Sequence, residues 1–297
     1  MMRLPAWISQ HLAALRALLV LTVLTGILYP LAVTAIAQLP GLKGKADGSL
    51  VKVGDTTVGS AIIGQGFVDS GGNPLVQYFQ TRPSAAGKGW DPTASGASNL
   101  GPESIVDTLP DLSTKGDTGR QSLLTQVCAR SLAAGRLEGV DGSRPYCTAG
   151  GVGAVLGVFY RSGATGPVTR VVSLNEACPA TPFVTVYRGV GVECAKFGAD
   201  YTRAVVLAIR GDAPAHPAVP ADAVTASGSG LDPQISLAYA KLQAPRVARA
   251  RGLDAATLQR LMDRYTTGRG LGFMGQPAVN VVQLNVALDR LYPYRKS

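Results

Sequence analysis

The chain has very little of what most metal sites and hydrolase active sites require. Among its 297 residues there are only two histidines, His11 and His216, and there is no C-x-x-C pair. Two isolated histidines argue against a multi-histidine metal site and against a Ser-His-Asp triad. The sequence also lacks a G-x-x-x-x-G-K-[ST] phosphate loop and a G-x-S-x-G nucleophile elbow. We therefore expect no catalytic residue and no metal site in this chain.

Charged residues are scarce as well, at 16% of the chain, against about 25% in typical soluble domains. Their balance is basic, with a net charge of +9, and the segment 241–297 holds ten Lys/Arg and three Asp. No interleaved aromatic residues or nucleic-acid-binding motif accompany this charge, so we expect no nucleic-acid partner. A solvated helix face, or contact with lipid headgroups or an acidic partner, is the expected use of these basic residues.

A long uncharged stretch lies near the N-terminus. The apolar run 17–37 has 21 residues, which as a helix would measure about 31 Å, close to the ~30 Å hydrocarbon core of a bilayer. We expect a transmembrane helix over 17–39. The alternative is a signal peptide cleaved after Ala37, because Ala35-Ile36-Ala37 fits a signal-peptidase site. The run exceeds the roughly 7–15 apolar residues of a signal peptide, which favours the uncleaved helix.

Small residues and a proline interrupt this apolar stretch. The ring of Pro30 meets the carbonyl of Gly26, four residues earlier, and the missing Cβ of Gly26 makes a kink sterically cheap. Thr22 and Thr25 lie near Gly26 and would form a small contact face for another membrane helix. Two interpretations stay open: simple tolerance of proline in a membrane helix, or a helix-packing site made of Thr22, Thr25, Gly26 and Pro30.

Beyond Pro40 no second apolar run is long enough to span a membrane. Short β-type runs predict a hairpin within 48–67, and a helix is expected over 122–134. Further strands are expected at 152–160, 168–174, 183–187 and 201–209. These strands precede a helical C-terminal part, so we predict the α+β class, with a small β-rich module ahead of the C-terminal helices.

The C-terminal part carries helix start and stop signals. Residues 245–251 are expected to form a helix that ends at Gly252. Asp254 and Asn280 are expected N-caps of the two helices that follow. The Gly/Ser loop 224–236 is expected to be a tight turn before a helix starting at Asp232-Pro233, although such a loop can also bind an anion.

The four cysteines all fall in one part of the chain, at positions 128, 147, 178 and 194. Four cysteines outside the cytoplasm allow three disulfide connectivities. We expect the sequential pairs Cys128–Cys147 and Cys178–Cys194; four free thiols facing the cytosol are the alternative. The expected divisions of the chain are an N-terminal cytoplasmic segment (1–16), the membrane helix (17–39), a first domain part (40–102), the Cys-containing insertion (103–220) and a helical C-terminal part (221–297).

Several segments resemble one known family. They are LTGILYPLAVTAIAQ (24–38), DGSL (47–50), YFQTRPSAA (78–86), SGASNLGP (95–102), VTASGSGLDPQIS (224–236), QAPRVARARGL (243–253) and GQPAVNVVQLNVALD (275–289). In this order they resemble the KdpC family, the C subunit of the bacterial high-affinity potassium-transporting P-type ATPase. The resemblance covers roughly residues 10–102 and 220–291 and leaves the Cys-containing insertion outside.

The resemblance implies a single-pass protein of the plasma membrane, with a cytoplasmic N-terminus and an extracytoplasmic main domain. It implies assembly with a catalytic ATPase subunit, a potassium-binding channel-like subunit and a small single-helix subunit, in contact with lipid. In such a complex the partners carry potassium and bind ATP, and this subunit acts as a catalytic chaperone for ATP binding. Gln243 is the residue we would test first for a nucleotide-related role. The alternative function is a secreted binding protein or enzyme released by signal cleavage.

Overall fold

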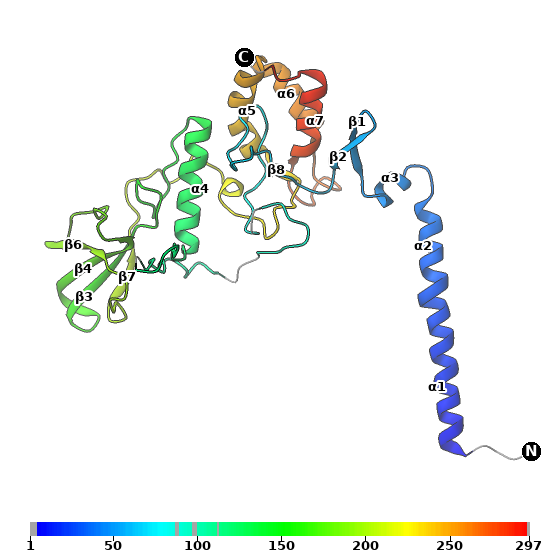
Figure 1. Cartoon of the computed structure of the whole chain (residues 1–297), viewed down its shortest axis with the longest axis horizontal. Helices are drawn as coiled ribbons and strands as arrows, with labels where there is room; N and C mark the ends of the chain where they lie inside the picture. Colours follow the sequence, from blue (N-terminus) through cyan, green and yellow to red (C-terminus); the bar gives the residue numbers. More distant parts are fainter. Residues whose placement is uncertain (1–4, 87–88, 97–99, 112, 296–297) are drawn as a thin grey trace, which may run out of the picture. The chain divides into compact units, whose positions relative to one another are not determined.

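The structure is a computed structural model that describes residues 5–86, 89–96, 100–111 and 113–295. The start of the expected N-terminal segment (1–4) and the middle of the SGASNLGP motif (97–99) lie outside the described residues. The chain divides into two compact units, Met1–Ile62 and Ile63–Ser297. Figure 1 labels the helices and strands of both units.

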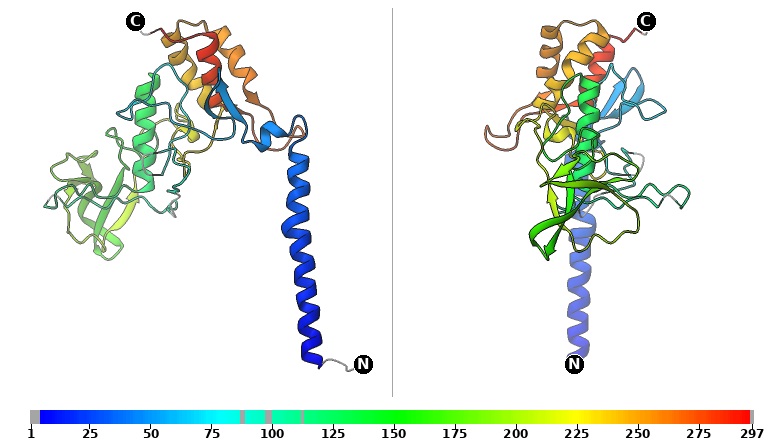
Figure 2. Two further views of the ribbon diagram at one scale, coloured as in Figure 1. Left: turned by 45° about the vertical axis from the view of Figure 1, so that its right-hand side comes forward. Right: turned by 90° about the vertical axis from the view of Figure 1, so that its left-hand side faces the viewer.

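The first unit begins with one continuous helical segment. It consists of α1 (Ala6–Val23), a π-helical turn (Leu24–Leu28) and α2 (Tyr29–Ala37), and Figure 2 shows it as an uninterrupted rod. By length and composition its 32 residues, with a mean hydropathy of 2.2 in the most apolar window, could cross a membrane. The helix starts eleven residues before the apolar run from which the span was predicted.

The π-helical turn explains how the helix accommodates Pro30. A proline cannot donate a backbone hydrogen bond, and its ring excludes the carbonyl four residues earlier. The wider turn over Leu24–Leu28 surrounds Gly26 and relieves this conflict. The hydroxyl of Thr25 donates to the carbonyl of Leu21 (2.7 Å), so its polar atom is satisfied within the helix.

A short helix and a hairpin complete the first unit. After α3 (Lys43–Ala46), strands β1 (Leu50–Val53) and β2 (Thr56–Ser60) pair antiparallel. Gly54 at the turn has a φ of +58°, a conformation that glycine adopts without a steric penalty. The hairpin predicted within 48–67 is confirmed.

The main core of the second unit packs three helices on a small sheet. The helices are α5 (Leu237–Arg251), α6 (Ala255–Arg264) and α7 (Val281–Leu291). The strands β8 (Gln234–Ser236), β10 (Ala278–Asn280) and β9 (Thr266–Thr267) lie in the order β8-β10-β9. The fully buried side chains of this core include Phe79, Val247, Leu258, Met262, Val279, Leu284 and Leu288.

Side-chain caps fix where these helices begin. Ser236, Asp254 and Asn280 each accept a hydrogen bond from the backbone N–H three residues later, which satisfies a donor that the helix leaves free. The predicted caps Asp254 and Asn280 are confirmed. The expectation of a helix starting at 232–233 or at Pro245 is wrong: α5 begins at Leu237 and carries Pro245 in its interior.

The Cys-containing module, residues 103–220, has its own sheet. It holds α4 (Leu123–Glu138), β3 (Val155–Ser162), β4 (Thr165–Ala177), β5 (Val186–Tyr187), β6 (Val190–Ala195) and β7 (Val205–Ala208), with strand order β5-β6-β4-β3-β7. Only β4 and β6 pair in parallel. Val155 and Leu156 belong to separate apolar clusters, since successive strand residues point to opposite faces. The mixed α+β class predicted from the sequence is confirmed.

Two pairs of cysteines lie at disulfide distance within this module. The sulfur atoms of Cys128 and Cys147 are 1.99 Å apart, and those of Cys178 and Cys194 are 1.92 Å apart. The first pair joins α4 to the segment before β3, and the second joins the end of β4 to β6. These are the two sequential pairs expected from the sequence, and their oxidation in the cell stays a prediction.

Helix α4 connects the module to the main core. Val127 and Ala134 pack against the main apolar core. The guanidinium of Arg130 on α4 donates to the carbonyl of Val224 (3.2 Å). Through α4, the module is thus attached to the main core by apolar packing and by a hydrogen bond.

Candidate functional site

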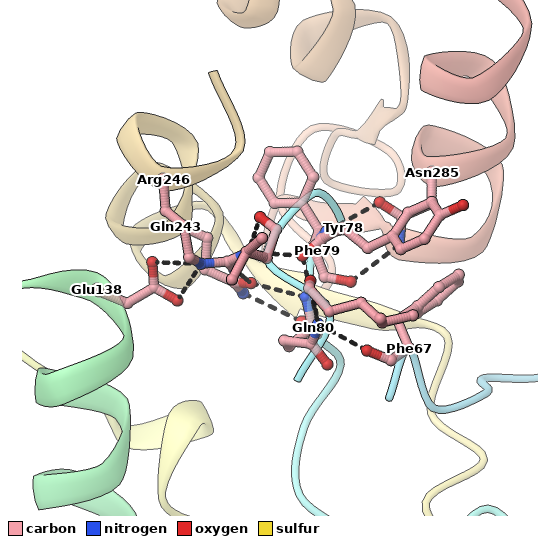
Figure 3. Close-up of polar contacts among 10 residues, drawn as sticks. Phe67, Tyr78, Phe79, Gln80, Glu138, Gln243, Arg246 and Asn285 are labelled. Atoms are coloured by element: carbon pink, nitrogen blue, oxygen red, sulfur yellow. Dashed lines mark hydrogen bonds and ion pairs between the residues drawn. The ribbon is translucent and has the colours of Figure 1, made fainter. Parts of the chain in front are cut away.

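Segment 76–81, here called the clamped segment, crosses the main core without belonging to any sheet. It contains the motif residues Tyr78, Phe79 and Gln80, and Phe79 is fully buried. The buried part of this segment, residues 79–81, leaves peptide N–H and C=O groups that must find partners away from water. Figure 3 shows the side chains of α4, α5 and α7 that reach toward this segment.

Two buried carboxamides satisfy its peptide groups. Gln243 of α5 accepts from the backbone N–H of Gln80 (2.6 Å) and donates to its carbonyl (3.0 Å). Asn285 of α7 does the same for Phe79, with both distances at 2.9 Å. A carboxamide offers one acceptor and two donors, so each of these side chains takes the place of a neighbouring strand. Both residues are fully buried.

Arg246 holds the same segment one helical turn further along α5. Its guanidinium donates to the carbonyls of Val76 (2.6 Å) and Tyr78 (2.9 Å) and to the carboxamide oxygen of Gln243 (3.0 Å). It also pairs with the carboxylate of Glu138 on α4 (3.0 Å), and both side chains are almost completely buried. Arg246 therefore joins the clamped segment, α5 and the Cys-containing module at one point.

Burial affects the electrostatics of this pair. Desolvation raises the pKa of the Glu138 carboxyl above its ordinary value, although the hydrogen bonds and charge of Arg246 act in the opposite direction. A buried charge is tolerated only when it is paired and hydrogen-bonded. Removing either partner would leave the other without compensation in the core.

Arg251, at the end of α5, also binds the clamped segment. Its guanidinium donates to the carbonyls of Gln77 (2.8 Å) and Tyr292 (2.8 Å) and pairs with the carboxylate of Asp289 (2.8 Å). The guanidinium also lies 5.0 Å from the ring centre of Tyr78. The expectation of a solvated basic face is therefore wrong for Arg246 and Arg251, because both guanidinium groups hold the fold together.

The Gly/Ser loop 224–236 packs against the chain that follows the clamped segment. The backbone N–H of Ala85 donates to the carbonyl of Ser227, and the N–H of Ser227 donates to that of Pro83 (both 2.8 Å). Arg82 pairs with Asp232 (2.8 Å). A Cβ on Gly64 would lie 2.5 Å from the carbonyl oxygen of Asp232, so only glycine allows this approach.

The start of α5 does not offer an open anion site. The carboxylate of Asp222 accepts from the backbone N–H (2.7 Å) and from the hydroxyl (2.9 Å) of Ser236, the N-cap of α5. A carboxylate of the chain itself therefore stands where an anion would bind. Of the two interpretations of this loop, the structure favours a packed turn.

The structure thus brings most of the quoted motifs together. The clamped segment, the Gly/Ser loop, α5 and α7 form one buried arrangement, and Gln243 lies at its centre. Sequence reasoning singled out Gln243 but missed Asn285, Arg246, Arg251 and Glu138. All but Glu138 stand inside motifs quoted for the family resemblance, which was the available signal.

Gln243 has no open surface toward a ligand in this arrangement. Its oxygen and nitrogen are engaged by the backbone of Gln80 and by Arg246. Throughout the part of the chain that the structure describes, every buried side-chain polar atom has a hydrogen-bond partner. A nucleotide could contact Gln243 only after the clamped segment moved, and its nucleotide-related role stays a prediction.

No metal centre is apparent in the described ranges, where no group of three or more His, Cys, Asp or Glu side chains could hold an ion. The other predicted site residues lie elsewhere. Thr22, Thr25, Gly26 and Pro30 stand on the helix of the first unit, and all four are exposed. The four cysteines lie in the Cys-containing module.

Comparison with known proteins identifies a family. The family model of KdpC, the c chain of the K+-transporting ATPase, matches residues 11–112 and 198–290. A potassium-transporting ATPase KdpC subunit of Mycobacterium tuberculosis is 36% identical over 282 residues, covering 95% of this chain and 98% of the relative. The KdpC subunit of Rhodospirillum rubrum is 36% identical over 273 residues, covering 92% and 91%. That of Kineococcus radiotolerans is 35% identical over 286 residues, covering 96% of each.

Proposed function

The chain belongs to the KdpC family, the c chain of K+-transporting ATPases, and from this we propose that it stabilises the assembly of the complex and promotes ATP binding by the catalytic subunit. Family membership makes it an accessory subunit for potassium uptake. The observation that carries the finer proposal is the match of the family model to both ends of the chain, whose motifs meet around the clamped segment. A non-catalytic role agrees with a sequence that lacks nucleophile and phosphate-loop motifs.

We propose that the helix Ala6–Ala37 anchors the chain in the plasma membrane and packs on partner helices. Thr25 and Gly26 lie in the π-helical turn and Thr22 and Pro30 flank it, and small side chains here let another helix approach closely. A Cβ on Gly26 would meet only the methyl of Thr22 at 3.9 Å, so the chain itself does not fill this position. The partners would be the channel-like potassium-binding subunit, the catalytic subunit and the small single-helix subunit.

The assembly role is tested by co-purification from membranes of potassium-starved cells. The tagged full chain should retain the other subunits of the complex, and deletion of residues 1–40 should abolish their recovery while leaving a folded domain. Gly26→Leu should reduce recovery because the larger side chain blocks close helix approach, whereas Leu18→Ala on the same helix serves as the control. Full recovery after the deletion would contradict the role of the helix.

The main domain is proposed to lie outside the cytoplasm, with the N-terminus inside. The two cysteine pairs at disulfide distance support this topology, because disulfides persist in oxidising compartments. Protease added to sealed spheroplasts should degrade the main domain. Protection of the domain in intact spheroplasts, with degradation only after lysis, would refute this orientation.

Two matched variants test the proposed promotion of ATP binding by the catalytic subunit. Gln243→Ala and Asn285→Ala each remove one carboxamide that holds the clamped segment. If both raise the KM for ATP of the assembled complex by the same factor, the effect passes through the clamped segment. A rise in KM for Gln243→Ala alone supports a nucleotide-related role of that residue, and an unchanged KM in both variants refutes the proposed chaperone effect.

A further inference from the structure

The loop between β9 and β10 carries the most exposed large apolar side chains of the described residues. Leu271 is 84% exposed and Phe273 is 72% exposed, and Met274 follows at 55%. The first two exceed every large apolar residue of the helix Ala6–Ala37, where the highest exposed fraction is 67%. Residues 269–274, here called the apolar tip, thus present two large apolar side chains that are individually more exposed than any on the helix Ala6–Ala37.

The apolar tip is held in a defined shape. Gly270 and Met274 exchange two backbone hydrogen bonds of 2.8 Å, which close the tip into a tight turn. The hairpin below it pairs Thr267 with Ala278, and β10 pairs in turn with β8. The tip is therefore presented by a strand of the main core, and little conformational freedom would be lost on binding.

Leu271, which follows Gly270 at the start of this turn, is an unusual choice of residue for folding alone. Leu271 has a φ of +51°, in the left-handed region that glycine and asparagine adopt more readily than leucine. Its side chain is almost fully exposed, so no burial within the chain offsets this cost. An exposed leucine in a strained backbone conformation points to a contact made outside the chain.

The charged residues near the apolar tip indicate which kind of partner it contacts. Between positions 264 and 288 there are two arginines, Arg264 and Arg269, and no acidic residue. The tip carries one aromatic side chain, Phe273, and a single arginine, whereas peripheral membrane contacts combine apolar and aromatic side chains with several basic residues. Phenylalanine, methionine and arginine, which the tip presents as Phe273, Met274 and Arg269, are instead among the residues enriched at protein–protein interfaces.

We propose that the apolar tip inserts into an apolar socket on another subunit of the potassium-transporting complex, with a carboxylate at the rim opposite Arg269. This inference rests on the proposed assembly function. The tip lies within residues 198–290, which the family model matches. The contact would orient the main domain on the complex, independently of the membrane helix.

Site-specific photo-crosslinking in the full chain, co-produced with the other subunits, tests the socket. Leu271→p-benzoylphenylalanine should form an adduct with a subunit of the complex. The control is Phe197→p-benzoylphenylalanine, since Phe197 is also exposed (55%) but lies outside the matched ranges. No protein adduct at 271, while the subunits still co-purify, would overturn the socket and indicate that the tip faces lipid or solvent. If the unmodified full chain retains no subunit, both this inference and the assembly role fail.

A second variant separates binding from folding. Leu271→Gly removes the side chain and suits the left-handed backbone, so the unfolding midpoint should stay the same or rise. We expect at least a tenfold loss of subunit retention after detergent washing, and Arg269→Glu should cause a further loss that is greater at low salt. Retention equal to that of the unmodified chain in Leu271→Gly would refute the proposed contact.

Discussion

The main core and the Cys-containing module provide hydrogen-bond partners for their buried peptide groups in different ways. In the main core, the clamped segment has no neighbouring strand, and Gln243, Asn285 and Arg246 supply its hydrogen-bond partners. In the module, the peptide groups of β3 and β4 pair with each other and with their outer neighbours β7 and β6 along strand ladders. Backbone ladders accept many sequences, whereas a side chain that replaces a strand must be one residue type at one position.

This difference agrees with how the family model covers the chain. The model matches 11–112 and 198–290 and leaves 113–197 unmatched. The three clamping residues fall within the matched ranges, and the ladder of β3 and β4 falls within the unmatched one. The comparison teaches that the segments with recognisable motifs are those where the fold depends on specific side chains.

The largest loss of stability is expected from replacing Arg246, which joins the clamped segment to the Cys-containing module. Arg246→Met would leave the buried Glu138 carboxylate without its cation and would remove the guanidinium that donates to the carbonyls of Val76 and Tyr78. Removing one partner of a buried ion pair costs about 3–5 kcal/mol. Denaturant unfolding of the full chain in detergent measures this loss. The double variant with Glu138→Gln should recover part of the stability, and strictly additive costs would contradict a coupled pair.

A smaller effect is expected from the module alone. Replacing both Cys178 and Cys194 with serine opens a link across 16 residues, which the chain-entropy model values at about 3 kcal/mol. The loss should be confined to the module because the clamp is unchanged. Amide hydrogen exchange would check this. We expect faster exchange in β4 and β6 with unchanged protection of α5, and faster exchange in all of these elements would contradict a loss confined to the module.

The smallest loss of stability is expected from removing one helix N-cap in each region. Ser122 caps α4 and Ser236 caps α5. Replacing an N-cap serine with alanine costs about 1 kcal/mol. The loss should be larger for Ser236→Ala, because its hydroxyl also donates to the carboxylate of Asp222 (2.9 Å). Equal shifts in unfolding midpoint for the two variants would show that the Asp222 contact adds nothing.

Local signals predicted much of the secondary structure. Asp254 and Asn280 marked the starts of α6 and α7 because capping is decided by one side chain and the next turn. Strand β6 was missed, since Gly191 and Glu193 interrupt its apolar pattern. The predicted helix 245–251 ends correctly at Gly252, but α5 begins eight residues before Pro245 and carries the proline in its interior.

The candidate site was predictable only in part. Gln243 was found within a motif, but its partner Gln80 lies 163 positions away, and no local pattern connects the two. The basic residues of α5 looked like a solvent-exposed set because sequence alone does not show that carbonyls of a distant segment converge on Arg246 and Arg251. Glu138 gave no signal, since it stands in a stretch outside the family motifs.

The ion pair between Glu138 and Arg246 has a consequence for how the chain can be shortened. Excising the Cys-containing module would remove Glu138 and leave the buried guanidinium of Arg246 without an acidic partner. A minimal version of this subunit should therefore carry a compensating change at 246 or a replacement acid in the new connection. A related chain without such a module is expected to neutralise this arginine by another route, and its residues near the corresponding position would show which one.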